Sequence, residues 1–234
     1  MDKLYIIIPA YNEEDNIASV AREWHTVVAK INSQSRLVII DDGSKDNTYN
    51  ILKTLETNLP QLIGITKPNN GHGATILYGY NYALEQGADF IFQTDSDRQT
   101  VAADFWQFWP QRNNFSVLLG HRNQRQDGWS RILITKILRL VLNCIFGLNI
   151  TDANVPFRLL QRKVLQKYLP KIPRDFYLAN VILTVYLVKH KENIKYIPIT
   201  FKPRGGGASF VNYKSIFKIG RRAVKDFWEV KKEL

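Results

Sequence analysis

The sequence contains few of the features that mark several common protein classes. Its 234 residues include a single cysteine, Cys144, which excludes an internal disulfide and a zinc site built from cysteines. No run of 18 apolar residues occurs, so we expect no membrane-spanning helix. There is no internal repeat or low-complexity tract, and the first residues already read as a strand, so we expect no signal peptide.

Acidic residues are scarce relative to basic ones. The chain has 21 Asp and Glu against 32 Lys and Arg, a net charge of +11. This excess favours an anionic partner, such as acidic lipid, a phosphorylated substrate or nucleic acid. We expect no nucleic acid, because the basic residues gather in one loop and the last helix and no RNP, KH or zinc pattern is present.

Short apolar runs alternate with amphipathic stretches through the first half of the chain. The runs that predict buried strands are 4–8, 37–40, 62–66, 90–93 and 117–120, and the stretches that predict helices are 13–30, 46–57 and 74–86. Strands and helices alternating at this spacing form right-handed βαβ units. The pattern therefore predicts an α/β fold with a mostly parallel, Rossmann-like sheet flanked by helices.

Two carboxylates, Asp95 and Asp97, follow the strand expected at 90–93. Burying them would be costly without a partner, but the carboxyl edge of an α/β sheet is where ligands bind. Carboxylate oxygens suit Mg²⁺ or Mn²⁺, and Mg²⁺ is usually held by one or two carboxylates together with substrate phosphates. The alternative is a polar turn in which Asp97 caps the next helix.

Other polar loops should lie on the same edge. Asp41 and Asp42 begin a turn after the second strand, and the glycine-rich loop 68–73 enters a helix and can present backbone N–H groups to an anion. It is neither a dinucleotide fingerprint nor a P-loop, and we expect His72 within it to be a loop or cleft residue rather than a base. The loop 121–131 carries three arginines, which favours phosphate binding over a merely solvated loop.

Three later segments are apolar or amphipathic. The aromatic helix expected at 102–109 should be mostly core, and the helix expected at 132–148 is nearly all apolar, so it is either deeply buried, which we favour, or lies in a membrane interface. The segment 211–234 predicts a basic amphipathic helix, docked on a main domain of residues 1–210 or lying on an anionic bilayer. The glycine-rich loop 203–207 is of the kind that closes over ligands.

Three motifs now stand in a recognisable order and spacing. They are Ile-Ile-Ile-Pro-Ala-Tyr-Asn-Glu-Glu at 6–14, Val-Ile-Ile-Asp-Asp-Gly-Ser-Lys-Asp-Asn-Thr at 38–48 and Gln-Thr-Asp-Ser-Asp-Arg-Gln at 93–99. The sequence resembles the family 2 glycosyltransferases, nucleotide-sugar enzymes of the GT-A fold. Within them it looks like the polyprenyl-phosphate sugar transferases of the dolichyl-phosphate mannosyltransferase type. The likeness covers residues 4–125 well and 126–210 more loosely.

This resemblance implies a set of site residues. Those implied to bind the nucleotide sugar are Pro9, Ala10, Tyr11, Glu13, Asp41, Asp42, Asp95, Ser96, Gln99, Arg158 and Arg204. Those implied to take part in catalysis are Asp97, Asp152, Arg122 and Arg131. In this scheme Asp95 and Asp97 hold the metal, Arg122 and Arg131 grip donor and acceptor phosphates, and Asp152 and Arg158 line the acceptor side.

The resemblance also implies an activity. The enzyme would transfer a sugar, with inversion and a divalent metal, from a nucleotide diphosphate sugar to an acceptor, most simply a polyprenyl phosphate. A saccharide hydroxyl is the alternative acceptor and would need a base, for which Asp152 is the candidate. A nucleotidyltransferase of similar fold and a catalytically silent sugar-nucleotide-binding module are the remaining alternatives. We expect a cytoplasmic protein, peripheral on the inner face of the membrane.

Three departures from the pattern affect the acceptor more than the donor. Arg98-Gln99-Thr100 stands where the lipid enzymes usually carry a Gln/Ser-His-Pro run, and Asn154-Val155-Pro156 replaces a small-residue and glycine stretch. The third departure is that no transmembrane helices follow the catalytic region.

Overall fold

The structure is a computed structural model that describes residues 1–122, 129–202, 223–232 and 234, with the backbone alone over 129–134. The strands are β1 (Leu4–Ala10), β2 (Arg36–Asp41), β3 (Leu62–Thr66), β4 (Phe90–Thr94), β5 (Val117–Arg122), β6 (Phe157–Gln161) and β7 (Ile194–Ile199). The α-helices are α1 (Ile17–Ile31), α2 (Thr48–Glu56), α3 (His72–Glu85), α4 (Phe105–Phe108), α5 (Trp129–Phe146), α6 (Arg162–Tyr168) and α7 (Ala179–Lys189). Residues 223–232 are also helical.

One sheet of seven strands, in the order β3-β2-β1-β4-β6-β5-β7, runs through the described part of the chain. Within it β6 pairs antiparallel with both β4 and β5, and the other pairs are parallel. Every residue of β1 is buried because helices cover both faces of the sheet, which is why this strand is apolar throughout. The sequence therefore predicted the α/β class and the parallel first half correctly.

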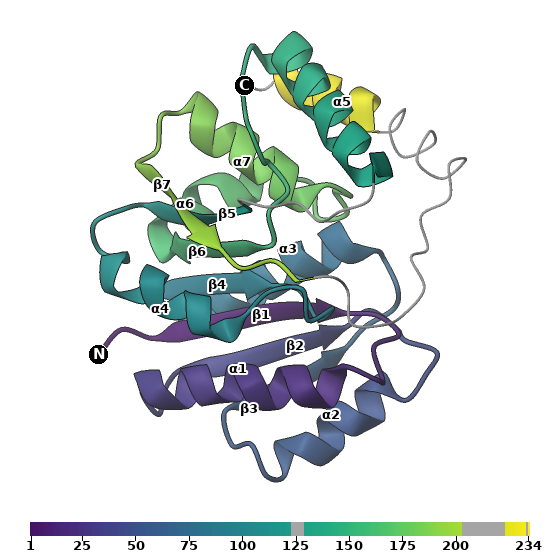
Figure 1. Cartoon of the computed structure of the whole chain (residues 1–234), viewed down its shortest axis with the longest axis vertical. Coiled ribbons are helices and arrows are strands. Elements are labelled where there is room, and N and C mark those ends of the chain that lie inside the picture. The colour runs from purple at the N-terminus through teal and green to yellow at the C-terminus, as the bar shows by residue number, and fades with distance from the viewer. Residues whose placement is uncertain (123–128, 203–222, 233) are drawn as a thin grey trace.

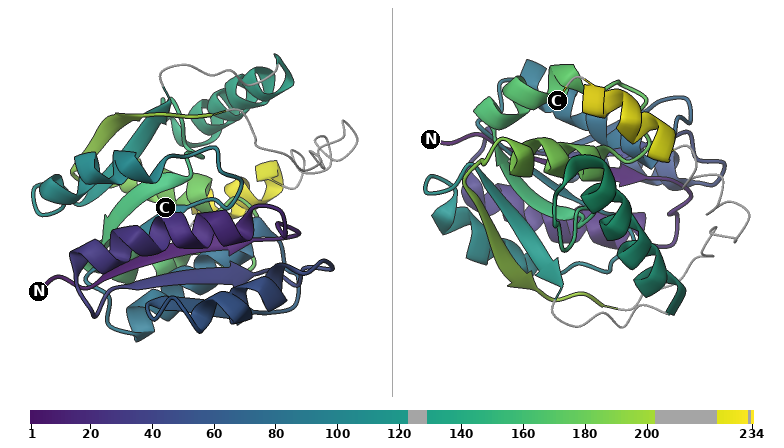
Figure 2. Two further views of the ribbon diagram at one scale, coloured as in Figure 1. Left: turned by 60° about the horizontal axis from the view of Figure 1, so that its bottom comes forward. Right: turned by 90° about the horizontal axis from the view of Figure 1, so that it is seen from above.

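The helices form a layer on each side of the sheet (Figure 1). Helices α1, α2 and α4 cover one face, and α3, α6 and α7 cover the other, as a second view confirms (Figure 2). Neighbouring residues of a strand point to opposite faces of the sheet, so Ile6 and Ile7 of β1 pack toward different helix layers. This three-layer arrangement leaves the carboxyl ends of the parallel strands as the edge at which loops meet.

An aromatic cluster centred on Phe92 of β4 packs the sheet against helices α1 and α4. Its ring lies 5.3 Å from Trp24 of α1, 5.1 Å from Phe105 of α4 and 4.7 Å from Phe157 of β6, measured between centroids. The pairs with Phe105 and Phe157 are edge-to-face and that with Trp24 is tilted, and aromatic pairs of this kind add about 0.5–1.5 kcal/mol each beyond their buried area. The cluster therefore sets the position of β4, the strand that leads into Asp95 and Asp97.

Two stretches differ from the sequence prediction. The expected helix 102–109 is broken into a 3₁₀ turn (Ala102–Asp104), α4 and a second 3₁₀ turn (Trp109–Gln111), and Trp106 is 37% exposed rather than core. Helix α6 was not predicted at all. It follows β6 without a loop and has only seven residues, too few for a helical period to stand out.

Residues 135–146 of helix α5, whose side chains the structure describes, are buried on one side only. Leu142, Ile145 and Phe146 pack into the core, whereas Ile137 is 52% and Leu140 64% exposed, so deep burial of the whole helix was wrong. No described helix is both long enough and apolar enough to cross a bilayer.

The helix at 223–232 inserts Phe227 into the body of the protein. This ring is fully buried, 5.9 Å from the ring of Phe146 and stacked at 6.2 Å on that of Phe176. The division into a domain of residues 1–210 and a helix of 211–234 stays a prediction.

Gly79 lets α3 lie against the sheet. A Cβ atom at this position would come 2.3 Å from Cγ2 of Ile7 and 2.7 Å from Cδ1 of Ile40. We expect Gly79→Ala to lower the free energy of unfolding by about 1–3 kcal/mol through overpacking, despite a gain of about 1 kcal/mol in helix propensity. Tyr78→Ala, at an exposed site one residue away, should change it by less than about 0.5 kcal/mol. Urea unfolding measures both, and a more stable Gly79→Ala variant would contradict this packing.

Candidate active site

The carboxyl ends of three adjacent parallel strands bring the candidate residues together. In the order β2-β1-β4, the central strand ends at Ala10, β2 ends at Asp41 beside it, and β4 leads into Asp95. Ala10 pairs directly with Asp41 across the sheet. The strand expected to end at residue 8 continues through Pro9 to Ala10, and the loops that follow Ala10, Asp41 and Thr94 share one edge, as the sequence predicted.

Asp95 is the most perturbed carboxyl group of this edge. Its Oδ1 accepts a hydrogen bond of 3.3 Å from the Gln93 amide and lies 3.6 Å from Nε2 of His72. Burial raises the pKa of Asp95 to about 6, with a further rise from the charge of Asp97, while His72, Arg122 and Arg158 oppose the rise. A site that makes a carboxylate this costly to ionise is one that gains from a bound cation.

The carboxylate pair fits a divalent cation that uses few protein ligands. Asp97 is partly exposed, and its Oδ1 accepts a hydrogen bond of 3.1 Å from the backbone N–H of Gln99. No group of three or more His, Cys, Asp or Glu side chains gathers around a common point among the described residues. Mg²⁺ accepts two protein carboxylates, with water and a diphosphate filling its remaining coordination positions. Mn²⁺ shares its preference for oxygen ligands.

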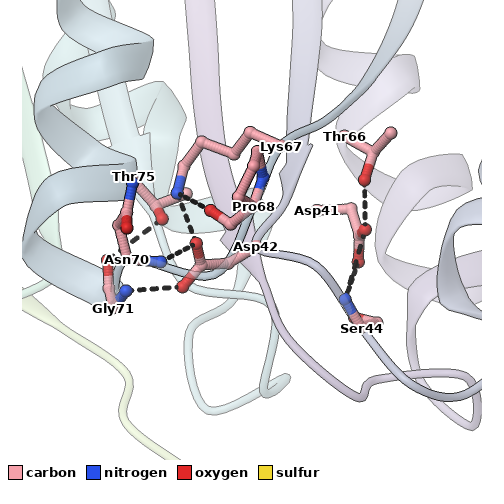
Figure 3. Close-up of polar contacts among 9 residues, drawn as sticks. All are labelled: Asp41, Asp42, Ser44, Thr66, Lys67, Pro68, Asn70, Gly71 and Thr75. Atoms are coloured by element: carbon pink, nitrogen blue, oxygen red, sulfur yellow. Dashed lines mark hydrogen bonds and ion pairs between the residues drawn. The ribbon is translucent and has the colours of Figure 1, made fainter.

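Asp42 organises the glycine-rich loop (Figure 3). Its carboxylate accepts hydrogen bonds from the backbone N–H groups of Asn70, at 3.0 Å, and Gly71, at 2.9 Å, and forms an ion pair with Lys67. Both of its oxygens are thus engaged in holding the chain that leads into α3. A contact between Asp42 and the nucleotide base stays a prediction, but the structure gives this residue a supporting role that the sequence did not reveal.

Asp41 is bound in a similar way on the other side of the turn. It accepts a hydrogen bond of 2.7 Å from the Thr66 hydroxyl and one of 3.2 Å from the backbone N–H of Ser44. These contacts join the end of β2 to β3, and they bury the carboxylate almost completely.

The first loop has a buried and an exposed part. Pro9 and Ala10 are buried in β1, and Tyr11 is 37% exposed at the edge, where it can meet a ligand. Glu13 is buried, and its Oε2 accepts a hydrogen bond of 2.8 Å from the Asn16 amide. Ribose binding by Glu13 stays a prediction, and its burial shows that it also holds the loop.

Arg122 and Asp152 form a two-pronged ion pair. Nε of Arg122 donates to Oδ2 of Asp152 at 2.8 Å, and Nη2 donates to Oδ1 at 3.0 Å. The guanidinium also lies 4.8 Å from the centre of the Phe201 ring. Because both oxygens of Asp152 accept from a cation, this residue orients Arg122 and is poorly placed to act as the base that we considered.

Arg158 does not line an open acceptor surface, contrary to the sequence prediction. It is fully buried on β6, opposite Gln93 of β4, and it donates to the carbonyls of Val155 at 2.8 Å and Asn180 at 3.3 Å. Burial lowers the pKa of Arg158. Its positive charge opposes the rise in the pKa of Asp95.

The remaining predicted residues lie beside the carboxylates or outside the description. Ser96 and Gln99 are buried, and Gln99 is tied to Lys202, whose backbone N–H donates to the Gln99 carbonyl at 2.7 Å and whose carbonyl accepts from the Gln99 side-chain amide at 3.1 Å. Arg204 lies outside the described residues. Arg131 belongs to α5, but its side chain is outside the description.

His72 is the site residue that sequence reasoning undervalued. It starts α3, half of its side chain is exposed, and it faces Asp95. Gly73 keeps it there, because a Cβ atom at 73 would lie 2.2 Å from the carbonyl oxygen of Tyr177 and 2.3 Å from that of Phe176. A histidine flanked by two glycines at a helix start was the available signal. Lys67 carried no such signal, since its pairing with Asp42 depends on the fold.

Comparison with known proteins agrees with this geometry. The family model for glycosyl transferase family 2 matches residues 5–169. A polyprenol monophosphomannose synthase of Mycolicibacterium smegmatis is 23% identical over 233 residues, covering 94% of this chain and 86% of that protein. A UDP-N-acetylglucosamine–dolichyl-phosphate N-acetylglucosaminyltransferase of Methanococcus voltae is 29% identical over 219 residues, covering 85% of each.

Solved structures show the same fold. The glucosyl-3-phosphoglycerate synthase of Mycobacterium tuberculosis, crystallised with Mn²⁺, uridine diphosphate and glucosyl-3-phosphoglycerate, has a TM-score of 0.72 to this chain. The two are 13% identical, and the match covers 99% of this chain and 80% of that one. At this identity the likeness establishes the GT-A fold and nothing about substrate.

We expect Asp42→Ala to unfold at lower denaturant than the parent protein. The change leaves two backbone N–H groups and Lys67 without their shared acceptor, which should cost about 3–5 kcal/mol. Glu85→Ala, which removes an exposed acid from the far end of α3, should cost less than about 0.5 kcal/mol. Equal stability of the two variants in urea would show that Asp42 does not hold the loop.

Proposed function

Because this chain belongs to glycosyl transferase family 2, we propose that it transfers a sugar, with inversion, from a nucleotide diphosphate sugar to a polyprenyl phosphate. The observation that carries the proposal is the pair Asp95 and Asp97 at the sheet edge shared with the loops after β1 and β2. The names of the relatives from M. smegmatis and M. voltae both refer to polyprenol or dolichyl-phosphate chemistry, and both align over most of this chain.

On the donor side, Tyr11 and the loop after β1 would hold the nucleoside. Asp95 and Asp97 would hold Mg²⁺ or Mn²⁺, which supplies positive charge to the leaving diphosphate. Loop 68–73 ends at the start of α3, where backbone N–H groups and the helix dipole favour an anion. His72 in this position would donate a hydrogen bond toward the same phosphates.

On the acceptor side, Arg122 would bind the phosphate of the lipid. Asp152 fixes the guanidinium plane, so less side-chain freedom is lost when a phosphate binds. Arg131 and Arg204, whose side chains lie outside the description, are proposed to add to this site. A lipid phosphate is already anionic at neutral pH and can attack the anomeric carbon without a general base.

A saccharide hydroxyl is the second candidate acceptor. It would need a base, and the candidate Asp152 is held by Arg122 in a two-pronged ion pair. Because both oxygens of Asp152 accept hydrogen bonds from Arg122, its contacts fit a role in orienting that arginine, and we favour the phosphate acceptor. A lipid acceptor also places the enzyme at a membrane surface, and we propose that it works on the cytoplasmic face as a peripheral protein.

The donor and acceptor are tested in two steps. A thermal-shift panel of nucleotide sugars with Mn²⁺ should show stabilisation by one nucleotide family, since ligands that bind only the folded state raise the melting temperature. The stabilising donor should then support transfer to a short-chain polyprenyl phosphate, with release of a nucleoside diphosphate. Transfer to saccharide hydroxyls alone would overturn the lipid acceptor, and release of free diphosphate from a nucleoside triphosphate would indicate a nucleotidyltransferase.

We expect Asp97→Ala to abolish metal-dependent transfer while the fold survives. Losing a carboxylate that would hold the metal against the leaving diphosphate should lower kcat at least about a hundredfold. The unfolding midpoint should stay close to that of the parent, because the substitution removes a partly exposed carboxylate that accepts from the backbone N–H of Gln99. Glu85→Ala serves as the charge-matched control with unchanged turnover. Parental turnover by Asp97→Ala, insensitive to a chelator, would remove the metal from the mechanism.

A further inference from the structure

Helix α5 presents a strip of apolar side chains to solvent. Ile137, Leu140 and Cys144 are exposed at spacings of three and four residues, so they share one face of the helix. The opposite face, with Leu142 and Ile145, is buried. Exposed isoleucine and leucine side chains in a row are unfavourable in water and mark an interaction surface.

A basic border runs along this strip. Lys136 and Arg139, followed by the neutral Asn143, are exposed and each precedes a residue of the apolar strip by one position, which places them on the adjoining side of the helix. Residues 129–146 contain no acidic residue. An apolar face beside a basic face is the pattern of helices that lie in the interface of an anionic bilayer.

The helix at 223–232 extends the same end of the molecule. Figure 1 shows it beside α5, at the end opposite β3 and α2, and its Phe227 contacts Phe146 of α5. Trp228 is 50% exposed, with Nζ of Lys231 4.7 Å from the centre of its ring. A hollow where the two helices meet has Lys189 and Lys231 in its lining, and paired ammonium groups of this kind suit a phosphate headgroup.

We propose that α5 and the helix at 223–232 together form a membrane-binding surface for anionic lipid. Ile137, Leu140 and Trp228 would enter the boundary between headgroups and acyl chains, and the lysines would meet lipid phosphates. A bilayer fits better than a second copy of the chain, because two-fold pairing of this face would bring its basic borders together.

The proposed membrane surface would place the acceptor site close to the bilayer. This step rests on the proposed function, since it matters only if the acceptor is a lipid. Helix α5 begins at Trp129, seven residues after Arg122, so the chain itself keeps the surface near the phosphate-binding arginine. A lipid phosphate in the same bilayer would then reach the site from the side that α5 occupies.

Vesicle sedimentation of the full chain, without nucleotide sugar, tests the surface. The protein should sediment with vesicles of phosphatidylcholine and phosphatidylglycerol and much less with phosphatidylcholine alone. The double variant Ile137→Ser, Leu140→Ser should bind at least about tenfold more weakly, since it loses two inserting side chains. Tyr78→Ser, at a comparably exposed aromatic residue on α3, should bind like the parent.

Charge is tested separately. Lys136→Glu should weaken binding to the anionic vesicles at least about fivefold, whereas Lys163→Glu, an equal charge change on α6, should not. Circular dichroism confirms that each variant is folded. Absence of parental binding to anionic vesicles, or binding unaffected by the double variant, would overturn the proposal, as would dimerisation that the double variant abolishes without any vesicle binding.

The proposed transfer activity is measured apart from this surface. Transfer to a short-chain polyprenyl phosphate in detergent, without vesicles, should proceed at the parental rate in the double variant. Loss of vesicle binding with transfer intact therefore tests the surface alone, and failure of transfer in the parent tests the proposed function alone.

Discussion

The structure depends on how it compensates negative charge that is collected at one edge of a sheet. The aspartates that gather there are Asp41, Asp42, Asp95, Asp97 and Asp152, beside the buried Glu13. Asp42 and Asp152 are paired with Lys67 and Arg122, and each ion pair also fixes a part of the site. Among the described residues, Asp95 and Asp97 form no ion pair with lysine or arginine, and the imidazole of His72 lies 3.6 Å from Asp95. The unmet charge marks where a cation and an anionic diphosphate would complete the site.

Local patterns account for the parts of the fold that were predicted. Apolar runs with turn residues after them gave the strands β1 to β5, and parallel pairing then placed the loops after β1, β2 and β4 at a single edge. What could not be predicted depends on contacts between distant residues. The burial of Arg158 follows from the antiparallel insertion of β6 between β4 and β5, and no local pattern around residue 158 announces that strand order. The role of Lys67 likewise appears only when β3 lies beside β2.

Helix α5 shows why composition alone left two interpretations open. Its residues are apolar on nearly every side, which suits either a buried helix or one at a membrane interface. The structure excludes deep burial, because α5 packs at one end of the molecule and its described side chains place a single face against the core (Figure 2). Burial of Leu142 and exposure of Leu140 belong to the same helix, and a pattern of hydrophobicity cannot distinguish them.

Gly73 ties the catalytic edge to the C-terminal half of the protein. With backbone carbonyls of Phe176 and Tyr177 against it, the first turn of α3 has no room to shift without displacing the entry to α7. Phe176 in turn stacks on Phe227, so a mechanical linkage runs from the last helix to the residue that faces Asp95. The two halves of this chain therefore cannot be exchanged independently between relatives, because a grafted C-terminal half would have to bring its backbone equally close to a glycine at position 73.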